Sequence, residues 1–374
     1  MPEGHTVHRL ARQFNDVFGG AVLAVSSPQG KFAAGAARLE GQVMELAEAQ
    51  GKQLFMFFSH ELVMRVHLGL YGAWDFGGDS TFTGASSIGA PRHVGEQEEP
   101  RSSVRDGGGR GDYAGPPEPK GAVRVRLVSP HGWADLRGPT ACEVLTRAGA
   151  AAVRAKLGPD PLLNRAGGRK EFVRRISTSA TPVALQLMKQ DVLAGVGNVY
   201  RAEVLFRRGL DPQLPGTSLQ RGEAGALWDE IALVMADGVL DGRIITTQLA
   251  DRPSGIGADV GHALAAAGMW EDRRGSEAAA GGGGPGAGAA DPAAPEAAAD
   301  PAAPEAAANP ATAEAGGGAE WKAPASNVNR DVPVEEAHYV YKRNGQPCRH
   351  CGTVVAMAEL GGRKLYWCPE CQRR

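Results

Sequence analysis

The chain has 374 residues, 43% of them hydrophobic, and carries a formal net charge of -2 at pH 7. A chain of this length can form two domains with their own cores, together with smaller appended parts. Its apolar stretches are all shorter than the roughly 20 residues that span a bilayer, and charges interrupt the N-terminus where a signal peptide would be apolar. We therefore expect a cytoplasmic protein with no membrane partner.

The negative net charge conceals an asymmetry along the sequence. Between Ser276 and Glu320 there are seven acidic residues and no basic residue. When these seven are left out, 40 basic residues face 35 acidic ones, and the tail from Glu335 onward is more basic still. Mildly basic folded parts suit a partner with a phosphate backbone, although a solvated surface explains the charge equally well.

The N-terminal part is expected to be an α+β domain over residues 1–139. Apolar residues from Thr6 to Phe18 recur at helical spacing, which predicts a long helix with one buried face. From Val43 to Leu127 the apolar residues come in short alternating runs between Gly and polar turns, which favours an antiparallel, β-sandwich-like sheet. Residues 76–119 are rich in Gly, Ser and Pro and have no apolar period, so we predict a disordered insertion there.

A helical domain is expected over residues 140–275. Helical spacing is clearest in the segments Pro182–Lys189, Asn198–Arg207 and Ser218–Asp237. Cys142 lies alone on a helical pattern, and packing in the core is its simplest explanation. Residues 276–334 follow as an acidic linker rich in Ala, Gly and Pro, in which DPAAPEAAA occurs twice. This composition is typical of a flexible tether.

The final module, residues 335–374, contains two Cys-x-x-Cys pairs separated by sixteen residues. Zn²⁺ prefers four thiolates in a tetrahedron, and two such pairs joined by a β-hairpin supply them. The alternative, a pair of disulfides, is disfavoured in a cytosolic compartment. Four cysteine ligands leave no open coordination position, so the metal would be structural. The predicted ligands are Cys348, Cys351, Cys368 and Cys371.

One arginine occupies a special place in the predicted hairpin. Arg363 follows the turn at Gly361–Gly362, so it would project from the hairpin tip. It is either a solvated turn residue or a cation that the hairpin carries to a phosphate.

Three distant pieces of the sequence together resemble one enzyme family. The chain begins Met1-Pro2-Glu3-Gly4, a helical segment contains LAGVGNVY from Leu193 to Tyr200, and the chain ends in the zinc hairpin. In this order they resemble the formamidopyrimidine-DNA glycosylase/endonuclease VIII family. The resemblance implies an α+β catalytic domain, a helix–two-turn–helix DNA-binding domain and a zinc-finger hairpin.

The same resemblance implies a function. The protein would be a bifunctional DNA glycosylase and abasic-site lyase of base excision repair. Its partner would be damaged double-stranded DNA, while single-stranded DNA stays open as a second form. We expect a monomer, associated with the nucleoid if the cell is prokaryotic.

The resemblance assigns catalytic roles to Pro2, Glu3, Lys52 and Arg363. Removal of Met1 would expose Pro2 as a secondary amine, and because α-amines titrate near about 8, a nucleophilic neutral fraction exists at physiological pH. Attack on C1′ of the damaged nucleotide would expel the base and form a Schiff base, which permits β/δ-elimination. Glu3 would transfer protons, Lys52 would assist elimination and Arg363 would hold a phosphate. For Lys52, an exposed turn lysine is the alternative.

Further residues are implied in DNA binding. Asn198, after the Gly195-x-Gly197 turn, would donate its amide to the DNA backbone, or it would cap the helix. Leu70, with Tyr71 beside it, would fill the hole that an extruded base leaves, or it would be a core leucine. Lys156 aligns with a phosphate-contacting position, and Glu203 would stabilise the helix–two-turn–helix motif.

The branch of the family bears on the substrate. The run from His67 to Trp74 resembles endonuclease VIII, and the strand Trp133–Gly138 lacks the Arg-Arg-Phe-Gly segment of the formamidopyrimidine branch, so oxidised pyrimidines are favoured. Two positions depart from the pattern. Gly69 stands where endonuclease VIII has glutamine, which leaves the wedge incomplete. Thr6 stands where many relatives have glutamate.

Other functions stay open at this point. An 8-oxoguanine- or formamidopyrimidine-type glycosylase is the nearest alternative, and a non-catalytic protein that binds damaged or abasic DNA is the next. A zinc-ribbon transcription or RNA-binding module would explain the tail alone. The long linker also predicts that the zinc hairpin docks only loosely without DNA.

Overall fold

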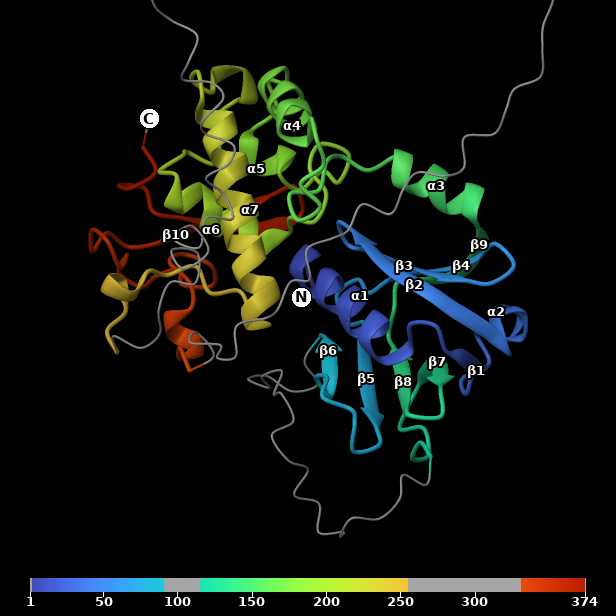
Figure 1. The fold of residues 1–374 in the computed structure, drawn as a ribbon. Helices are drawn as coiled ribbons and strands as arrows, with labels where there is room; N and C mark the ends of the chain where they lie inside the picture. Colours follow the sequence, from blue (N-terminus) through green and yellow to red (C-terminus); the bar gives the residue numbers. More distant parts are fainter. Residues whose placement is uncertain (1, 91–114, 255–330, 374) are drawn as a thin grey trace, which may run out of the picture. The chain divides into compact units, whose positions relative to one another are not determined.

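The computed structural model describes residues 2–90, 115–254 and 331–373 (Figure 1). Most of the predicted insertion, residues 91–114, lies outside the described residues, and so does most of the predicted linker, within residues 255–330.

The first helix, α1 (Gly4–Phe18), begins two residues before the predicted start. Its buried face carries Leu10, Phe14 and Phe18, as the spacing of the apolar residues predicts. The ring of Phe14 meets that of Trp74 edge to face, with 4.8 Å between the ring centroids. This helix is therefore the centre of the N-terminal core.

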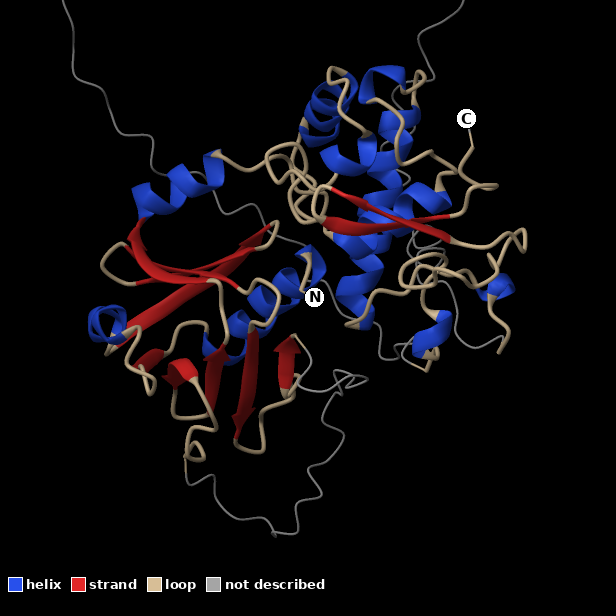
Figure 2. Ribbon diagram, turned by 180° about the vertical axis from the view of Figure 1, so that it is seen from behind, coloured by secondary structure: helices blue, strands red, loops and turns tan. Residues whose placement is uncertain are grey.

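Within the described residues, nine strands form one antiparallel sheet in the order β6-β5-β8-β7-β1-β2-β3-β4-β9. The strands are β1 (Val22–Ser26), β2 (Gln42–Gln50), β3 (Gln53–Phe58), β4 (Leu62–His67), β5 (Ala73–Gly78), β6 (Ser87–Gly89), β7 (Val123–Val128), β8 (Gly132–Arg137) and β9 (Ala141–Thr146). Figures 1 and 2 show α1 between the two halves of this sheet, and the short helix α2 (Ala33–Leu39) lies at its edge. The expected antiparallel, sandwich-like fold is confirmed.

The beginning of the predicted insertion is part of the sheet, which corrects the boundary at residue 76. Strand β5 continues to Gly78, and β6 pairs with it so that Trp74 faces Ile88. Phe76 and Ile88 are both buried. The Gly- and Ser-rich composition conceals this pairing because a three-residue strand contributes one apolar side chain and no period.

The boundary at residue 139 is also wrong. Strand β9 pairs with β4 along its whole length, and helix α3 (Arg147–Ala155) packs Ala150 on Phe55 and Val63. The N-terminal domain therefore extends to Ala155. Cys142 lies on β9 and not on a helix, but it does pack against the core, and burial raises the pKa of its thiol to about 12.

The helical domain contains α4 (Gly168–Ser177), α5 (Val183–Gln186), α6 (Asn198–Arg207) and α7 (Glu223–Asp241), with the short 3-10 helices η1 (Gly216–Ser218) and η2 (Leu249–Asp251). The segment predicted from Ser218 begins as a helix only at Glu223, because Gly222 before it is left-handed at φ 87°. Among the described helices, none is both long and apolar enough to cross a membrane.

The C-terminal module forms the predicted hairpin, β10 (Ala356–Leu360) and β11 (Arg363–Trp367), after the short 3-10 helix η4 (Val334–Glu336). Both turn glycines, Gly361 and Gly362, have positive φ, which allows the tight reversal. Leu365 of β11 joins the core of the helical domain.

Several contacts fix this module to the helical domain. The buried carboxylate of Glu203 accepts hydrogen bonds from three consecutive backbone N–H groups, those of Tyr339, Val340 and Tyr341, at 2.8 to 2.9 Å. The ring of Tyr339 stacks on Phe206 at 4.7 Å between centroids. Glu203 was expected to stabilise the helix–two-turn–helix motif, but its carboxylate instead binds the backbone of the C-terminal module. These contacts argue against the loose docking that the linker suggested.

Candidate active site

Three chain segments that are far apart in sequence meet at glycines. The N–H of Gly4 donates to the carbonyl of Gly195 at 2.9 Å, and a Cβ on Gly4 would lie 2.9 Å from the Cα of Gly195. A Cβ on Gly51 would lie 2.8 Å from that of Ala194. Only glycine permits such close backbone approach. This junction brings Pro2, Lys52 and the glycine-rich loop before α6 together.

Glu3 is fixed beneath the junction. Its side chain is fully buried, and its carboxylate accepts from the N–H groups of Gly197 at 2.7 Å and Val199 at 2.9 Å. These N–H groups belong to the first turn of α6, where a helix favours an anion. A Cβ on Gly197 would come within 2.5 Å of the Glu3 carboxyl carbon, so glycine at this position makes room for the acid.

Asp160, which was not among the predicted site residues, supports the same region. Its buried carboxylate accepts from the N–H of Gly51 at 2.6 Å and lies 2.8 Å from Nε2 of His8. It thereby joins α1 and the turn before Lys52 to the start of the helical domain. The motif Leu157-Gly158-Pro159-Asp160 was the available signal, but only its neighbour Lys156 was chosen.

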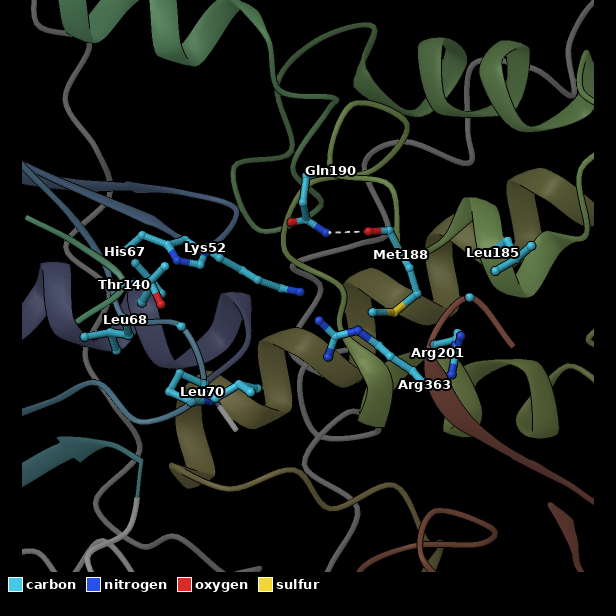
Figure 3. Close-up of a pocket in the computed structure, with 14 residues that line it drawn as sticks. Lys52, His67, Leu68, Leu70, Thr140, Leu185, Met188, Gln190, Arg201 and Arg363 are labelled. Carbon is cyan, nitrogen blue, oxygen red and sulfur yellow. Dashed lines mark hydrogen bonds between the residues drawn. The ribbon is translucent and has the colours of Figure 1, made fainter. Parts of the chain in front are cut away.

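A pocket of about 500 Å³ opens at this place (Figure 3). One wall comes from the N-terminal domain and the other from the helical domain and the hairpin tip. The lining includes Pro2, Lys52, His67, Leu68, Gly69, Leu70 and Thr140 on the first wall, and Leu185, Met188, Gln190, Arg201, Gly361 and Arg363 on the second. Figure 3 shows the side chains of Lys52 and Arg363 reaching into the pocket from opposite sides.

The pocket changes the acid–base properties of its cations. Burial lowers the pKa of Lys52, Glu3 opposes this shift, and the positive charge of Arg363 adds to it. The pKa of His67 is lowered first by burial and then by Lys52. Lys52 is therefore a better proton acceptor here than a surface lysine, and it is not the exposed turn lysine considered as the alternative. His67 was not among the predicted site residues.

Arg201 is a second residue that the sequence analysis missed. Its side chain is buried, and its Nη2 donates to the carbonyl of Lys364 at 3.2 Å and to the side-chain oxygen of Asn198. Burial, followed by the repulsion of Arg363, lowers its pKa to about 10. Among the residues that the structure describes, Nε and Nη1 of Arg201 have no hydrogen-bond partner, so the guanidinium retains donors at the pocket wall.

The structure gives Asn198 a partner within the protein. Its Nδ2 donates to the Lys364 carbonyl at 3.0 Å, which ties α6 to β11. Gly197, and not Asn198, is the N-cap of α6, so the capping alternative is wrong. Lys156 is exposed at the C-cap of α3 and does not line the pocket.

The two proposed wedge residues lie on the loop after β4. Leu70 is 45% exposed and lines the pocket, so the alternative of a core leucine is wrong for it. Tyr71 is 80% exposed and does not line the pocket. The buried leucine of this loop is Leu68.

Thr6 does not line the pocket. Its hydroxyl lies 3.2 Å from Nε2 of His5, and both residues are buried. Burial lowers the pKa of His5 to about 3, so its imidazole is neutral at physiological pH. The position where many relatives carry an acid is occupied here by an uncharged pair.

The four cysteines of the C-terminal module fit a zinc ion. Their Sγ atoms all lie within 4.8 Å of one another, with 3.4 Å between Cys351 and Cys368 and 3.9 Å between Cys348 and Cys371. Tetrahedral zinc thiolates require about 3.8 Å between sulfurs, whereas a disulfide bond is about 2.05 Å long. The disulfide alternative is therefore wrong.

Known protein families match three parts of the chain. Residues 1–106 match the formamidopyrimidine-DNA glycosylase N-terminal domain, and residues 157–249 match the formamidopyrimidine-DNA glycosylase H2TH domain. Residues 345–374 match a zinc finger found in FPG and IleRS. The order is the one that the sequence motifs predict.

Individual relatives agree with these matches. Endonuclease 8 1 of Mycobacterium tuberculosis (strain H37Rv) is 36% identical over 372 residues, which cover 100% of both chains. Formamidopyrimidine-DNA glycosylase of Streptococcus pneumoniae (strain R6) is 22% identical over 222 residues, 59% of this chain and 53% of that protein.

Solved structures share the fold. Lactococcus lactis Fpg in complex with DNA containing N7-benzyl-Fapy-dG has a TM-score of 0.60 at 14% identity, and the match covers 100% of both chains. The same protein with DNA containing an abasic site has a TM-score of 0.59 at 14% identity, with the same coverage.

Proposed function

The chain belongs to the formamidopyrimidine-DNA glycosylase/endonuclease VIII family, and from this premise we propose that it excises damaged bases from DNA and cuts the strand at the resulting abasic site. The observation that carries the proposal is the convergence of Pro2, Lys52 and Arg363 on one pocket, with Glu3 fixed directly beneath. These residues come from the N-terminus, a β-turn and the hairpin tip. Their convergence is what a strand-cleaving site needs, because an amine, a proton carrier and a phosphate-binding cation must act on one nucleotide.

Pro2 is the proposed nucleophile. The mechanism requires removal of Met1, so that Pro2 carries a free secondary amine. Its lone pair attacks C1′ of the damaged nucleotide, the bond from C1′ to the base breaks, and the base leaves with that electron pair and takes up a proton. The Pro2 nitrogen then loses its proton, and its lone pair breaks the bond from C1′ to the ring oxygen O4′, which takes up a proton. The product is an iminium ion between the Pro2 nitrogen and C1′.

The iminium makes strand cleavage possible. It withdraws electrons from the sugar, so a proton can leave C2′ and the 3′ phosphate can depart as the leaving group. Lys52 suits this proton transfer because burial lowers its pKa. Glu3, held by two backbone N–H groups, is placed to protonate the sugar oxygen. Arg363 supplies charge to a departing phosphate, and a second elimination would release the 5′ phosphate.

Zinc has a structural part in this proposal. The four cysteines would hold one Zn²⁺ in the C-terminal module, and the metal would fix the hairpin whose turn precedes Arg363. Asn198 and Arg201 bind the carbonyl of Lys364, next to Arg363, and so aim the same strand. We propose that Asn198 and the exposed Lys156 contact the DNA backbone.

Oxidised pyrimidines are the proposed substrates. The turn between β7 and β8 is closed by a hydrogen bond from Ser129 N–H to the Gly132 carbonyl at 2.8 Å. Its exposed His131 binds Asp79 and does not line the pocket. This turn therefore offers no side chain to the place from which a base is extruded, which supports the endonuclease VIII branch. The proposed working form is a monomer on duplex DNA.

Borohydride trapping tests the proposal. The wild-type protein, incubated with abasic-site DNA and borohydride, should form a covalent adduct that peptide mass analysis maps to Pro2. Pro2→Gly should lose the adduct, whereas Pro28→Gly, at an exposed turn of the same domain, should keep it. An adduct on Lys52, or strand cutting by protein that retains Met1, would show that the mechanism is wrong.

A lesion panel tests the substrate class. Duplexes containing thymine glycol, dihydrouracil or 8-oxoguanine should be cut fastest at the pyrimidine lesions. Faster excision of 8-oxoguanine would favour the formamidopyrimidine branch of the family. Binding without any cutting would favour a non-catalytic damage-binding protein.

A further inference from the structure

The loop after β4 has a fixed shape, and one neighbouring residue accounts for it. The N–H of Gly72 donates to the Leu68 carbonyl at 3.0 Å, which closes the loop into a turn. Within this turn Leu68 is buried, and Leu70 is the half-exposed apolar side chain that reaches the pocket.

Gly69 lies in the middle of this turn with φ at +68°, a conformation that side chains disfavour. A Cβ at this position would lie 1.8 Å from Oγ1 of Thr140 and 3.0 Å from its Cβ. Rotation of the Thr140 hydroxyl would remove the first contact and leave the second. Position 69 therefore cannot carry a side chain while Thr140 stands beside it. The departure at Gly69 is a consequence of this packing and not simply a missing part of the wedge.

Thr140 is itself held in place. Its N–H donates to the carbonyl of His67 at 2.9 Å, at the end of β4 where the loop begins. The next residue, Ala141, pairs with His67 as β9 starts. A second contact lies close by, because a Cβ on Gly138 would come within 2.9 Å of the Tyr71 carbonyl oxygen. The segment 138–140 thus forms a wall along the loop.

We propose that Thr140 is a positioning residue for Leu70. It fills the space above Gly69, fixes the left-handed turn, and so presents Leu70 to the space that an everted nucleotide leaves in the duplex. This inference rests on the proposed function. A preformed loop enters DNA without the cost of ordering, which is why its rigidity matters for the rate of eversion.

The test compares duplex DNA with single-stranded DNA. Each variant is incubated with the same abasic-site oligonucleotide, alone or paired with a strand that carries 2-aminopurine opposite the site. The rate of borohydride-trapped adduct formation is measured on both forms, and 2-aminopurine fluorescence reports insertion into the duplex. A single strand has no stacked helix to open, so the ratio of the duplex rate to the single-strand rate isolates the contribution of the wedge.

The variants separate the contact with Thr140 from general strain. Gly69→Ala adds the clash, Thr140→Gly removes the wall, Thr140→Ser keeps Cβ and Oγ, and the double variant Gly69→Ala/Thr140→Gly relieves the clash. Gly41→Ala is the matched control, because Gly41 has φ at +70° and nothing within 4 Å of the added Cβ. It reports the backbone strain alone.

The expected pattern follows from the geometry. The duplex-to-single-strand ratio should fall by about tenfold in Gly69→Ala and in Thr140→Gly, since residues in direct contact are coupled to this extent. It should stay within about twofold of wild type in Thr140→Ser and Gly41→Ala, and the double variant should recover part of the loss of Gly69→Ala. The fluorescence change should follow the ratio.

Two results would overturn the inference. One is a ratio for Gly69→Ala equal to that of Gly41→Ala, and the other is a Thr140→Ser variant as impaired as Thr140→Gly. Failure of the proposed function is distinguishable from both, because the wild-type protein would then form no adduct with either form of DNA.

Discussion

The carboxylate of Glu203 should determine whether the C-terminal module, residues 335–374, stays bound to the helical domain. It is fully buried, and Oε1 accepts from the N–H groups of Val340 and Tyr341 while Oε2 accepts from that of Tyr339 and from the Thr246 hydroxyl. Glu203→Ala leaves three backbone donors without an acceptor in a place that water reaches poorly. Such unsatisfied groups cost about 1–3 kcal/mol each, and removal of one partner from a buried charged network costs about 3–5 kcal/mol in total.

Glu203→Gln should have a smaller effect. The amide replaces one carboxylate oxygen, but the Thr246 hydroxyl can rotate to accept from it, so one N–H group loses its acceptor. The expected cost is about 1–3 kcal/mol.

Amide hydrogen exchange measures both variants directly. Because about 1.4 kcal/mol corresponds to a tenfold change, Glu203→Ala should accelerate exchange at Tyr339–Tyr341 and in β11 by about a hundredfold or more. Glu359→Gln, at an exposed position of β10, is the matched control and should leave exchange unchanged. If Glu203→Ala exchanged its amide hydrogens as slowly as the wild type, or at the same rate as Glu203→Gln, the reasoning would be refuted.

Deletion of residues 262–326 should leave the module docked, since Thr246 N–H binds the Ala337 carbonyl at 2.9 Å across the linker. The shorter loop should raise the free energy of unfolding by about 1 kcal/mol in a urea titration, and detachment of the module would contradict this. Gly197→Ala should reduce the single-turnover cleavage rate by about a hundredfold and also lower the melting temperature, because its Cβ displaces Glu3 from the two N–H groups that hold it; an unchanged rate would exclude this role. As the pH falls from 6.5 to about 3, the free energy of unfolding should decrease by up to about 5 kcal/mol, because His5 is protonated in the unfolded state but stays neutral in the folded state. His5→Gln should reduce this pH dependence in denaturant titrations. Chelation of zinc should abolish strand cutting and accelerate amide hydrogen exchange in β10 and β11. Strand cutting by the metal-free protein would argue against a structural metal.

Local patterns in the sequence were sufficient for the elements whose physics is local. The helical period from Thr6 to Phe18 specifies a buried face, and the spacing of the four cysteines specifies a four-thiol cluster, because both depend on residues that are near in sequence. The glycines before Asn198 and the Pro2-Glu3 start predicted the parts of the pocket. They did not predict how the parts meet.

Sequence patterns alone did not predict how the short strands pair. Strand β6 has a single apolar residue, and the apolar residues of β9 do not alternate as in a typical strand, so the hydrogen bonds to β5 and β4 decide their conformation. The same holds for Asn198, which the sequence assigned to DNA and which the structure joins to Lys364 across 166 positions. Arg201 and Thr140 gave no signal in the sequence, and the motif around Asp160 did not reveal its role, because these roles depend on partners that are remote in the chain.

By itself, the sequence determined the type of each part: a helix and antiparallel sheet at the front, a glycine-rich helical motif, and a four-cysteine hairpin at the end. Only the tertiary structure decided that Gly4, Gly51 and Gly195 touch, that Leu70 is half exposed at the pocket whereas Leu68 is buried, and that Glu203 holds the tail. The physical reason is that periodicity and ligand spacing act within a few residues. A site, by contrast, depends on steric fit and hydrogen bonds between segments that are distant in sequence and meet only when the whole chain folds.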